Sequence, residues 1–447
     1  MTRAVPCPGG ALPIRKMGKM RKISLLFMLA CICPVLAAAG AKAEEVVIRN
    51  GTILTVTRGT IEKGSVLIRD GKIVEIGKTV HASPSAKVID ATGKYVMPGI
   101  VDAHSHIALD GDINEATAPV TPHMVMADAF QYDDKSIYHI LAGGVTSSLL
   151  LHGSANVIGG QALVIKHKFG KPRDALIFQG ALPSIKFASG ENPKRVYGGR
   201  QQMPSTRMGN FFVLRQAMAE AKDYIQEWEQ YNARLKKGDP AKAGLPPKKD
   251  LKLEALADIL RGKFLVQIHC YRADEFLTEM RIAREYGYPI RAFHHALEAY
   301  KVADELAKAD IGTAIFADWW GYKVEAWDAI PWAGAILWKK GVRVAVKSDS
   351  EDFARRLNQE AAKLVRYGGV PEEEALAMIT INPAWIAGID HRVGSLEPGK
   401  DADIAIWDAH PLSIYAKVEK VLIEGEVYFD RSLPGYGTPF YSTRPKE

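Results

Sequence analysis

The middle of this chain alternates short apolar segments with stretches of helical pattern, and this alternation constrains the fold more than any other feature. Seven segments read as buried strands, at residues 99–103, 145–150, 184–187, 264–268, 290–293, 312–317 and 342–346. Strands that alternate with helices are typical of βα units and a parallel sheet. Residues 98–394 are long enough for a (β/α)8 barrel, which takes about 250 residues. We therefore predict an α/β fold, a TIM-like (β/α)8 barrel with a helical insertion at about 207–262.

The two ends of the chain share a second pattern, in which apolar and polar residues alternate between turns. Residues 44–97 contain the dipeptides Asn-Gly and Asp-Gly, and residues 395–447 contain Glu-Gly. Alternation around such pairs predicts antiparallel strands. We expect the two ends to form one small composite β-sandwich domain.

Residues 1–43 read as a secretory signal peptide. Arg21 and Lys22 precede an apolar run, and the sequence Ala-Lys-Ala closes the segment. A basic start, an apolar segment and an A-x-A cleavage site are the three parts of a signal peptide. Pro34 and the shortness of the apolar run argue against a membrane anchor. We therefore expect an exported protein, periplasmic or secreted, that begins at Glu44 and keeps no membrane segment.

Charge and cysteine content narrow the class of protein. The formal charge is +7, but residues 1–43 hold seven basic residues and no acidic ones, so the remainder carries equal numbers of each sign. A chain without a basic excess is not expected to bind nucleic acid. Cys270 is the one cysteine after residue 43, so no internal disulfide is expected there. We interpret Cys270 as a small buried residue.

Metal-ligand residue types stand where several of the predicted strands end. His104 and His106 follow the first strand two residues apart, so they share one face of it. The same types end three later strands, as His269, as the pair His294 and His295, and as Asp349. Loops at the carboxyl ends of barrel strands form the active face of such folds. Imidazole and carboxylate together suit Zn²⁺ or a similar divalent ion.

Eight motifs are spread over nearly the whole chain after residue 43. They are PGIVDAHSHI, GGVTSSLL, IKFASGENPKR, QIHCYRADE, FHHALEAY, VKSDS, ITINPAWIAGID and GSLEPGKDADIAIWD. With these motifs the chain resembles the amidohydrolase superfamily, in its imidazolonepropionase-like branch that also holds dipeptidases of prolidase type. The resemblance implies a metal-bearing (β/α)8 barrel with a composite β-sandwich, and hydrolysis of C–N bonds in amides, cyclic amides or amidines.

The resemblance also implies roles for the strand-end residues. The positions that match metal ligands are His104, His106, His269, His295 and Asp349. His294 is the alternative to His295 for the sixth-strand ligand, although it faces the other side of the strand. Asp349 is expected to accept a proton from water and pass it to the leaving nitrogen. His269 is expected to stabilise the developing oxyanion.

Lys186 bears on whether the site holds one metal ion or two. In two-metal relatives a fourth-strand lysine reacts with CO₂, and the resulting carbamate bridges the ions. Only a neutral amine reacts in this way, so the lysine needs a depressed pKa. Lys186 lies between two apolar residues at a strand end and matches this position, while Glu191 is the rival ligand of one-metal relatives. The resemblance thus implies one or two divalent ions, with Zn²⁺ as the expected metal and a carboxylated Lys186 as the expected bridge.

Four residues are predicted to contact the substrate, namely Arg272, Trp320, Tyr322 and Lys347. Arg272 suits bidentate binding of a substrate carboxylate, with a salt bridge to Asp274 or Glu275 as the alternative. Lys347 shares a strand face with Asp349, so it is expected to orient that carboxylate.

The remaining substrate candidates lie in two loops. Trp320 and Tyr322 follow the seventh strand, either as the wall of a pocket or as a cap on the barrel. Asn192, Lys194 and Arg195 follow the fourth strand, either as substrate contacts or as part of a turn.

The sequence thus predicts an exported, metal-dependent amidohydrolase with a small-molecule substrate. A dipeptide or an N-acyl amino acid with a free carboxylate is the expected substrate. A cyclic amidohydrolase or deaminase of imidazolonepropionase type is the alternative, and its products would be a ring-opened compound or ammonia. A metal-free binding relative is disfavoured, because every expected ligand type is present. No nucleic-acid partner is expected, and the oligomeric state, a homo-oligomer included, stays open.

Overall fold

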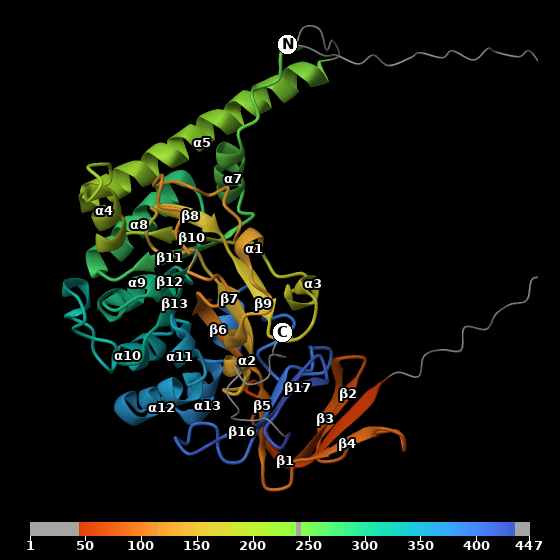
Figure 1. The fold of residues 1–447 in the computed structure, drawn as a ribbon. Helices are drawn as coiled ribbons and strands as arrows, with labels where there is room; N and C mark the ends of the chain where they lie inside the picture. The colour runs from red at the N-terminus through yellow and green to blue at the C-terminus, as the bar shows by residue number, and fades with distance from the viewer. Residues whose placement is uncertain (1–43, 112, 238–242, 434–447) are drawn as a thin grey trace, which may run out of the picture. The chain divides into compact units, whose positions relative to one another are not determined.

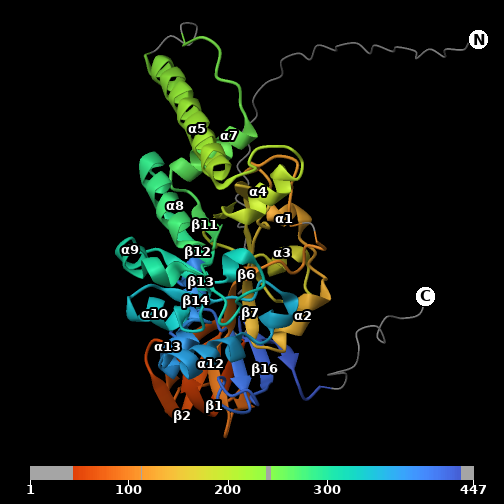
Figure 2. The ribbon, with the colours of Figure 1, turned by 90° about the vertical axis from the view of Figure 1, so that its left-hand side faces the viewer.

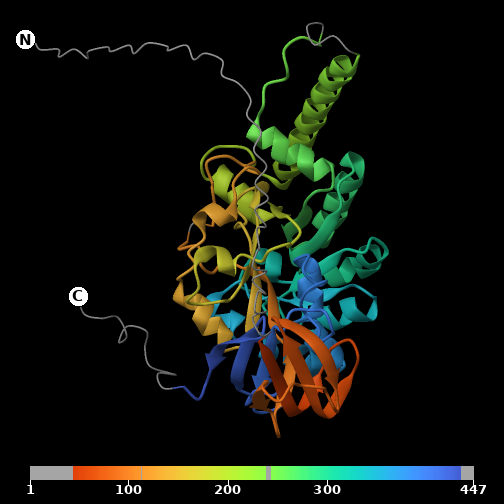
Figure 3. The same cartoon turned by 90° about the vertical axis from the view of Figure 1, so that its right-hand side faces the viewer.

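The computed structural model describes residues 44–111, 113–237 and 243–433 and has an α/β fold (Figures 1, 2 and 3). The predicted signal peptide lies outside the described residues, as does the end of the predicted sandwich domain beyond residue 433. Within the described ranges, no helix combines the length and the apolar character needed to cross a membrane.

Two sheets form the centre of the molecule. One has the strand order β14-β13-β12-β11-β10-β8 and the other the order β6-β7-β9. Their strands are β6 (Ile100–Ser105), β7 (Val145–Leu150), β8 (Ile158–Gln161), β9 (Leu163–Lys166), β10 (Ser184–Ala188), β11 (Leu265–Cys270), β12 (Ile290–His295), β13 (Gly312–Ile315) and β14 (Val344–Val346). Strands β10 to β14 are parallel neighbours. Strands β6, β7 and β10 are buried along their whole length, as parallel strands covered on both faces are.

All seven predicted strands are present, but the sequence pattern did not predict β8 and β9, which run antiparallel to β10 and β7. Gly159 and Gly160 interrupt the apolar pattern of β8 and so hid it. Ala162, between the two strands, donates its N–H to Ser184 O at 2.8 Å and links the two sheets.

The first and last strands, β6 and β14, approach each other without forming a strand ladder in the described residues. The N–H of Asp349 donates to His104 O at 3.0 Å, just beyond β14. Ser348 donates its N–H to Asp102 Oδ1 at 3.2 Å and its hydroxyl to Asp102 Oδ2. The centre is therefore an α/β assembly of strands, and closure into a (β/α)8 barrel stays a prediction.

Strands from both ends of the chain pair in one eight-stranded sheet. Its order is β17-β16-β15-β5-β1-β2-β3, with β4 beside β1. The strands are β1 (Glu45–Leu54), β2 (Thr60–Arg69), β3 (Lys72–Gly77), β4 (Lys87–Asp90), β5 (Tyr95–Pro98), β15 (Ile404–Trp407), β16 (Val418–Ile423) and β17 (Glu426–Asp430). Ile404 lies opposite Pro98 in the antiparallel pair β15–β5, so segments far apart in the sequence lie side by side (Figure 3). The boundaries of the composite sandwich domain stay a prediction.

Helices connect the central strands and cover their outer side (Figure 2). They are α1 (Met126–Ala129), α2 (Lys135–Leu141), α3 (Arg173–Leu176), α4 (Glu191–Gly198), α5 (Arg207–Lys236), α7 (Leu251–Leu260), α8 (Ala273–Tyr286), α9 (Ala303–Lys308), α10 (Ala333–Lys339), α11 (Glu351–Ala354), α12 (Leu357–Gly368), α13 (Glu372–Ala377) and α14 (Ile381–Ile386), with 3-10 turns η1 (Ala299–Val302) and η2 (Val324–Ala326). Helices α5 and α7 pack against each other where the sequence predicts a helical insertion (Figure 1).

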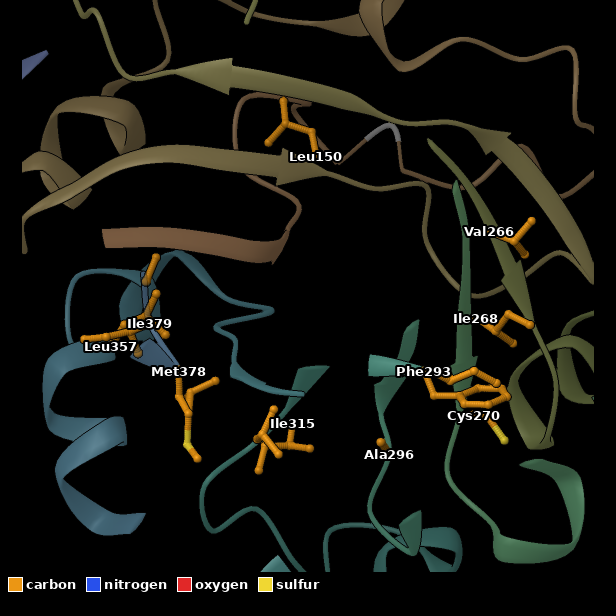
Figure 4. Packing of buried hydrophobic residues seen from close by; sticks show 14 of the residues in the cluster. Leu150, Val266, Ile268, Cys270, Phe293, Ala296, Ile315, Leu357, Met378 and Ile379 are labelled. Carbon is orange, nitrogen blue, oxygen red and sulfur yellow. The ribbon is translucent and has the colours of Figure 1, made fainter. Parts of the chain in front are cut away.

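The main hydrophobic core lies between the central strands and these helices. Figure 4 shows part of it, with Val266, Ile268 and Phe293 from neighbouring strands. Cys270 is fully buried in the same cluster, so it is a small buried residue as predicted. Burial of apolar surface stabilises the fold by about 25 cal/mol per Å², so this cluster holds strands and helices together.

A buried lysine joins the central strands to the sheet of the chain ends. Lys166 is the last residue of β9, and its Nζ lies 2.6 Å from Asp401 Oδ2 and 3.1 Å from Asp403 Oδ2. Glu424 Oε1 lies 3.0 Å from the same nitrogen. Burial alone would lower the pKa of Lys166, but the three carboxylates outweigh burial and raise it. The lysine therefore stays charged. Asp401 and Glu424 also contact other cations, whereas Asp403 forms an ion pair with Lys166 alone among the described residues.

We expect Lys166→Met to lower the free energy of unfolding by about 3–5 kcal/mol, because it leaves the buried carboxylate of Asp403 without its cation. Lys171→Met is the matched control, since Lys171 forms an exposed ion pair with Glu426 at 2.8 Å, and it should cost less than about 1 kcal/mol. Urea unfolding followed by circular dichroism measures both. Equal losses in the two variants would contradict a structural role for the buried lysine.

Candidate active site

The strand ends bring most of the predicted metal ligands together. His104 lies near the end of β6, and His106 follows that strand directly. The Nε2 atoms of His104 and His106 lie 3.3 Å apart. Asp349 Oδ1 lies 3.0 Å from His104 Nε2 and 3.3 Å from His106 Nε2. Three ligand atoms from two distant segments therefore face one point.

His295 belongs to the same cluster. One ligand atom each of His104, His295 and Asp349 lie within 4.8 Å of one another. The ring centroid of His295 lies 5.0 Å from that of His104 and 4.3 Å from that of His269. Both ring nitrogens of His295 and Nε2 of His269 are buried without a hydrogen-bond partner among the described residues. Buried polar atoms are rarely left unpaired, so these nitrogens are available to bind a ligand such as a metal ion.

The cluster fits a divalent metal ion. Ligand atoms about 2.0–2.2 Å from a tetrahedral ion lie about 3.3–3.6 Å apart, close to the separations around His104 Nε2. Burial lowers the pKa of His104, His269 and His295 well below the usual value, so the rings are neutral and keep a free lone pair. The donors are nitrogen and oxygen without sulfur, the set that suits Zn²⁺ and similar ions.

Asp349 is held in its ionised form. Burial would raise its pKa, but the neighbouring Lys347 and His104 outweigh burial and hold the pKa well below the usual range. Lys347 Nζ lies 3.6 Å from Asp349 Oδ2, and burial lowers the pKa of Lys347 to about 8. Lys347 thus contacts Asp349, as strand alternation predicts, and it is placed to orient that carboxylate.

Lys186 lies at the edge of the same cluster. It belongs to β10, is fully buried, and its Nζ lies 3.5 Å from His104 Nε2. The ammonium donates to His152 O at 3.3 Å. Burial lowers the pKa of Lys186 to about 7, against the opposing effect of Asp349. A substantial fraction of this lysine is therefore a neutral amine near neutral pH, as carbamate formation requires.

The two neighbouring histidines of β12 have different surroundings. His294 Nδ1 lies 2.9 Å from His104 Nδ1, and His294 Nε2 lies 2.8 Å from Gln267 Oε1. Both nitrogens of His294 therefore already have partners, one on His104 and one on Gln267, whereas both nitrogens of His295 stay available. This arrangement favours His295 over His294 as the ligand.

Three residues at the ends of these strands have a left-handed backbone. The φ angle is 67° at His295, 49° at Ala296 and 60° at Asp349. Such conformations cost non-glycine residues roughly 1–3 kcal/mol and concentrate at functional sites. The strand ends are thus bent where they present their side chains, which supports a functional role for this face.

Sequence reasoning missed Asp102 and Ser154. Asp102 Oδ1 accepts from the N–H groups of His104 and Ser348, each at 3.2 Å, and burial raises the pKa of Asp102 to about 6. Ser154 Oγ lies 2.7 Å from His269 Nδ1 and so orients that ring. A signal for Asp102 was present, since it stands two residues before His104 on the same strand face. Ser154 carries no comparable signal.

Arg272 does not join the cluster. Its Nε lies 2.9 Å from Asp274 Oδ1, and the side chain is 41% exposed. The salt bridge that the sequence offered as the alternative is therefore the contact that the structure has.

The aromatic candidates lie in the loop after β13. Tyr322 donates its hydroxyl to Tyr271 OH at 2.9 Å, and the Tyr271 ring stacks on His295 with centroids 5.0 Å apart. Tyr322 is thus connected to the ligand cluster through one aromatic ring. Trp320 is 53% exposed, and it lines a pocket together with His295.

Glu191, the rival metal ligand, faces cations instead of the histidines. Its Oε1 lies 3.5 Å from Arg195 Nη1 and 3.6 Å from Lys323 Nζ. Asn192 Oδ1 accepts from the same Lys323 Nζ at 3.1 Å. Lys194 is exposed. The start of α4 therefore forms a polar group of its own beside the ligand cluster.

Comparisons with known proteins all point to the same family. The sequence profile of the Amidohydrolase family matches residues 333–428. The chain is 36% identical over 392 residues to amidohydrolase tasK of Hapsidospora irregularis, covering 82% of this chain and 40% of that protein. It thus spans about two fifths of that relative's length. It is 25% identical over 432 residues to imidazolonepropionase of Mesorhizobium japonicum, covering 83% of this chain and 94% of the relative.

A solved structure extends the likeness over a whole protein. The amidohydrolase from Thermotoga maritima MSB8 is 39% identical, with a TM-score of 0.80, and the match covers 86% of this chain and 100% of that one. Since the identity is high over the full length of that relative, this chain belongs to the amidohydrolase family.

Proposed function

We propose that this protein is a metal-dependent hydrolase that cleaves the C–N bond of a dipeptide or an N-acyl amino acid. The observation that carries the proposal is the convergence of His104, His295 and Asp349, whose ligand atoms lie within 4.8 Å of one another. Membership of the amidohydrolase family supports the same reaction class. We also propose that β6 and β14 close a (β/α)8 barrel, because hydrogen bonds join the ends of these strands.

The chain's own residues suggest how the reaction runs. A divalent ion held by His104, His106, His295 and Asp349 would supply Lewis-acid activation of water and of the scissile group. Asp349, kept ionised next to Lys347, accepts a proton from water and delivers it to the leaving nitrogen. The fixed position of Asp102 and Ser348 keeps this carboxylate beside His104.

The direction of the hydrogen bond between Ser154 and His269 determines whether His269 can donate a proton or bind a metal ion. If the Ser154 hydroxyl donates to Nδ1, then Nε2 carries the proton and can donate to a developing oxyanion. If Nδ1–H donates to Ser154 Oγ, then Nε2 has a lone pair for a metal ion. Either way the serine fixes the ring with Nε2 toward the cluster.

We expect protein prepared with Zn²⁺ and bicarbonate to bind close to two metal ions per chain. Lys186→Ala should bind close to one, because the bridging carbamate needs the amine of Lys186. Elemental analysis of the metal-to-protein ratio measures the difference, and loading with Mn²⁺ tests the choice of metal. Lys301→Ala, which alters a surface ion pair with Asp328, should leave the ratio unchanged. A ratio that Lys186→Ala does not change discards the bridge.

Metal-loaded protein should release free amino acids from a panel of dipeptides and N-acyl amino acids. Asp349→Asn should lower kcat by about 100-fold or more, because the proton acceptor is lost. Asp352→Asn, an exposed acid on the next helix, is the matched control and should keep full activity. Amino-acid analysis of the products measures turnover. No release by protein that has bound its metal would rule out this substrate class.

A second candidate is a cyclic amidohydrolase or deaminase. The likeness to an imidazolonepropionase over most of both chains favours it. Its products distinguish it, because hydrolysis of a ring amide or amidine gives a ring-opened compound or ammonia in place of a free amino acid.

We further propose that the protein is exported and begins at Glu44. The basic start, the apolar run and the Ala-Lys-Ala sequence of residues 1–43 support this proposal. Amino-terminal sequencing of protein expressed with its own leader in a bacterial host should begin at Glu44, in the periplasm or the medium. Ala43→Arg should block cleavage and retain the leader. An uncleaved wild-type chain in the cytoplasm would overturn the proposal.

A further inference from the structure

A pocket of about 370 Å³ opens beside the ligand cluster. It is lined by Asn114, Ser154, Ala155, Asn192, Arg195 and Val196. Ser154 is the residue that contacts His269 Nδ1 at 2.7 Å, so one wall of the pocket also orients a predicted ligand. A group bound in this pocket therefore lies next to the site of reaction.

Two asparagines that line the pocket have amide donors without partners in the described residues. The N–H of Ala155 donates to Asn114 Oδ1 at 3.0 Å, and Lys323 Nζ donates to Asn192 Oδ1 at 3.1 Å. A backbone N–H and an ammonium only donate, so these contacts fix which end of each amide is the oxygen. Both Nδ2 groups donate to no other group in the part of the chain that the structure describes. Two amide donors are therefore left for a ligand.

A guanidinium adds further donors on the same side. Arg195 lies on α4 with its side chain 74% exposed, and its ion pair is with Glu191, at 3.5 Å. Lys323 Nζ lies 3.6 Å from Glu191 and 3.8 Å from Glu325, so this lysine is shared between two carboxylates. The pocket thus combines unmatched amide donors with one exposed guanidinium.

We infer that this pocket is the subsite for the substrate's free carboxylate, with the amide groups of Asn114 and Asn192 and the guanidinium of Arg195 as its donors. A carboxylate only accepts hydrogen bonds, so it matches a wall of donors, and its charge strengthens each bond. A neutral ring amide presents donors as well as acceptors and would leave some donors unmatched. The inference rests on the proposed function, because it places a carboxylate-bearing substrate at the ligand cluster. This subsite takes over the binding of the substrate carboxylate that the sequence assigned to Arg272, which is paired with Asp274 instead.

Equilibrium binding of two probes to the metal-loaded protein tests the assignment. N-methylsulfonyl-L-leucine and N-methylsulfonyl-L-leucinamide carry a sulfonamide in place of the cleavable amide, and they differ in the charged carboxylate alone. We expect calorimetry to give at least a tenfold preference for the carboxylate, about what one charge-assisted hydrogen bond supplies. Asn114→Asp keeps the oxygen that accepts from Ala155 and replaces the free donor by an anionic oxygen. It should weaken carboxylate binding about tenfold and leave amide binding within about twofold.

Arg195→Gln should have the same effect, because it removes the charge and most of the donors. Arg284→Gln, an exposed arginine on α8, is the matched control and should bind both probes as the wild type does. Circular dichroism checks that each variant is folded. Absence of a preference for the carboxylate in the wild type overturns the assignment, and so does a preference that survives both pocket variants.

Because binding is measured without turnover, the two proposals can fail separately. A carboxylate preference that depends on Arg195, in a protein that hydrolyses no member of the substrate panel, supports the subsite and rejects the proposed reaction. Hydrolysis of N-acetyl-L-leucine and N-acetyl-L-leucinamide at equal kcat/KM, unaffected by the pocket variants, supports the reaction and overturns the subsite.

Discussion

The buried carboxylate of Asp102 is the contact on which the geometry of the site depends. It accepts hydrogen bonds from the backbone of His104 on β6 and from Ser348 just beyond β14. These bonds hold the first and last strands together where no strand ladder joins them in the described residues. His104 and Asp349 come within 3.0 Å of each other as a consequence. A buried carboxyl group this well bonded is costly to disturb, so the pairing is rigid.

The two buried lysines beside the ligand cluster have different partners. Lys186 and Lys347 are both fully buried, and burial depresses the pKa of each. Lys347 is paired with Asp349, whereas Lys186 faces His104 and a backbone carbonyl. One lysine therefore supports an anion, and the other is available as a neutral amine. The left-handed backbone at His295 and Asp349 fits the same picture, since both side chains are turned toward the cluster.

Much of this arrangement was predictable, because buried strands are apolar and a polar side chain at the end of such a strand is conspicuous. His104, His269, His295 and Asp349 were found in this way. Strand β8 was not, since its two glycines remove the apolar pattern. Ser154 was not, because its role depends on a partner 115 residues away. The choice between His294 and His295 also needed the structure, since sequence gives the face of a strand but not which nitrogens already have partners.

The central claim is that the ends of β6, β12 and β14 form one metal centre. Anomalous diffraction from crystals of the Zn²⁺-loaded protein, recorded at the zinc absorption edge, tests it most directly. The account predicts a peak about 2.0–2.2 Å from ligand atoms of His104, His295 and Asp349. A fully loaded protein whose zinc peak lies away from these three side chains would contradict it.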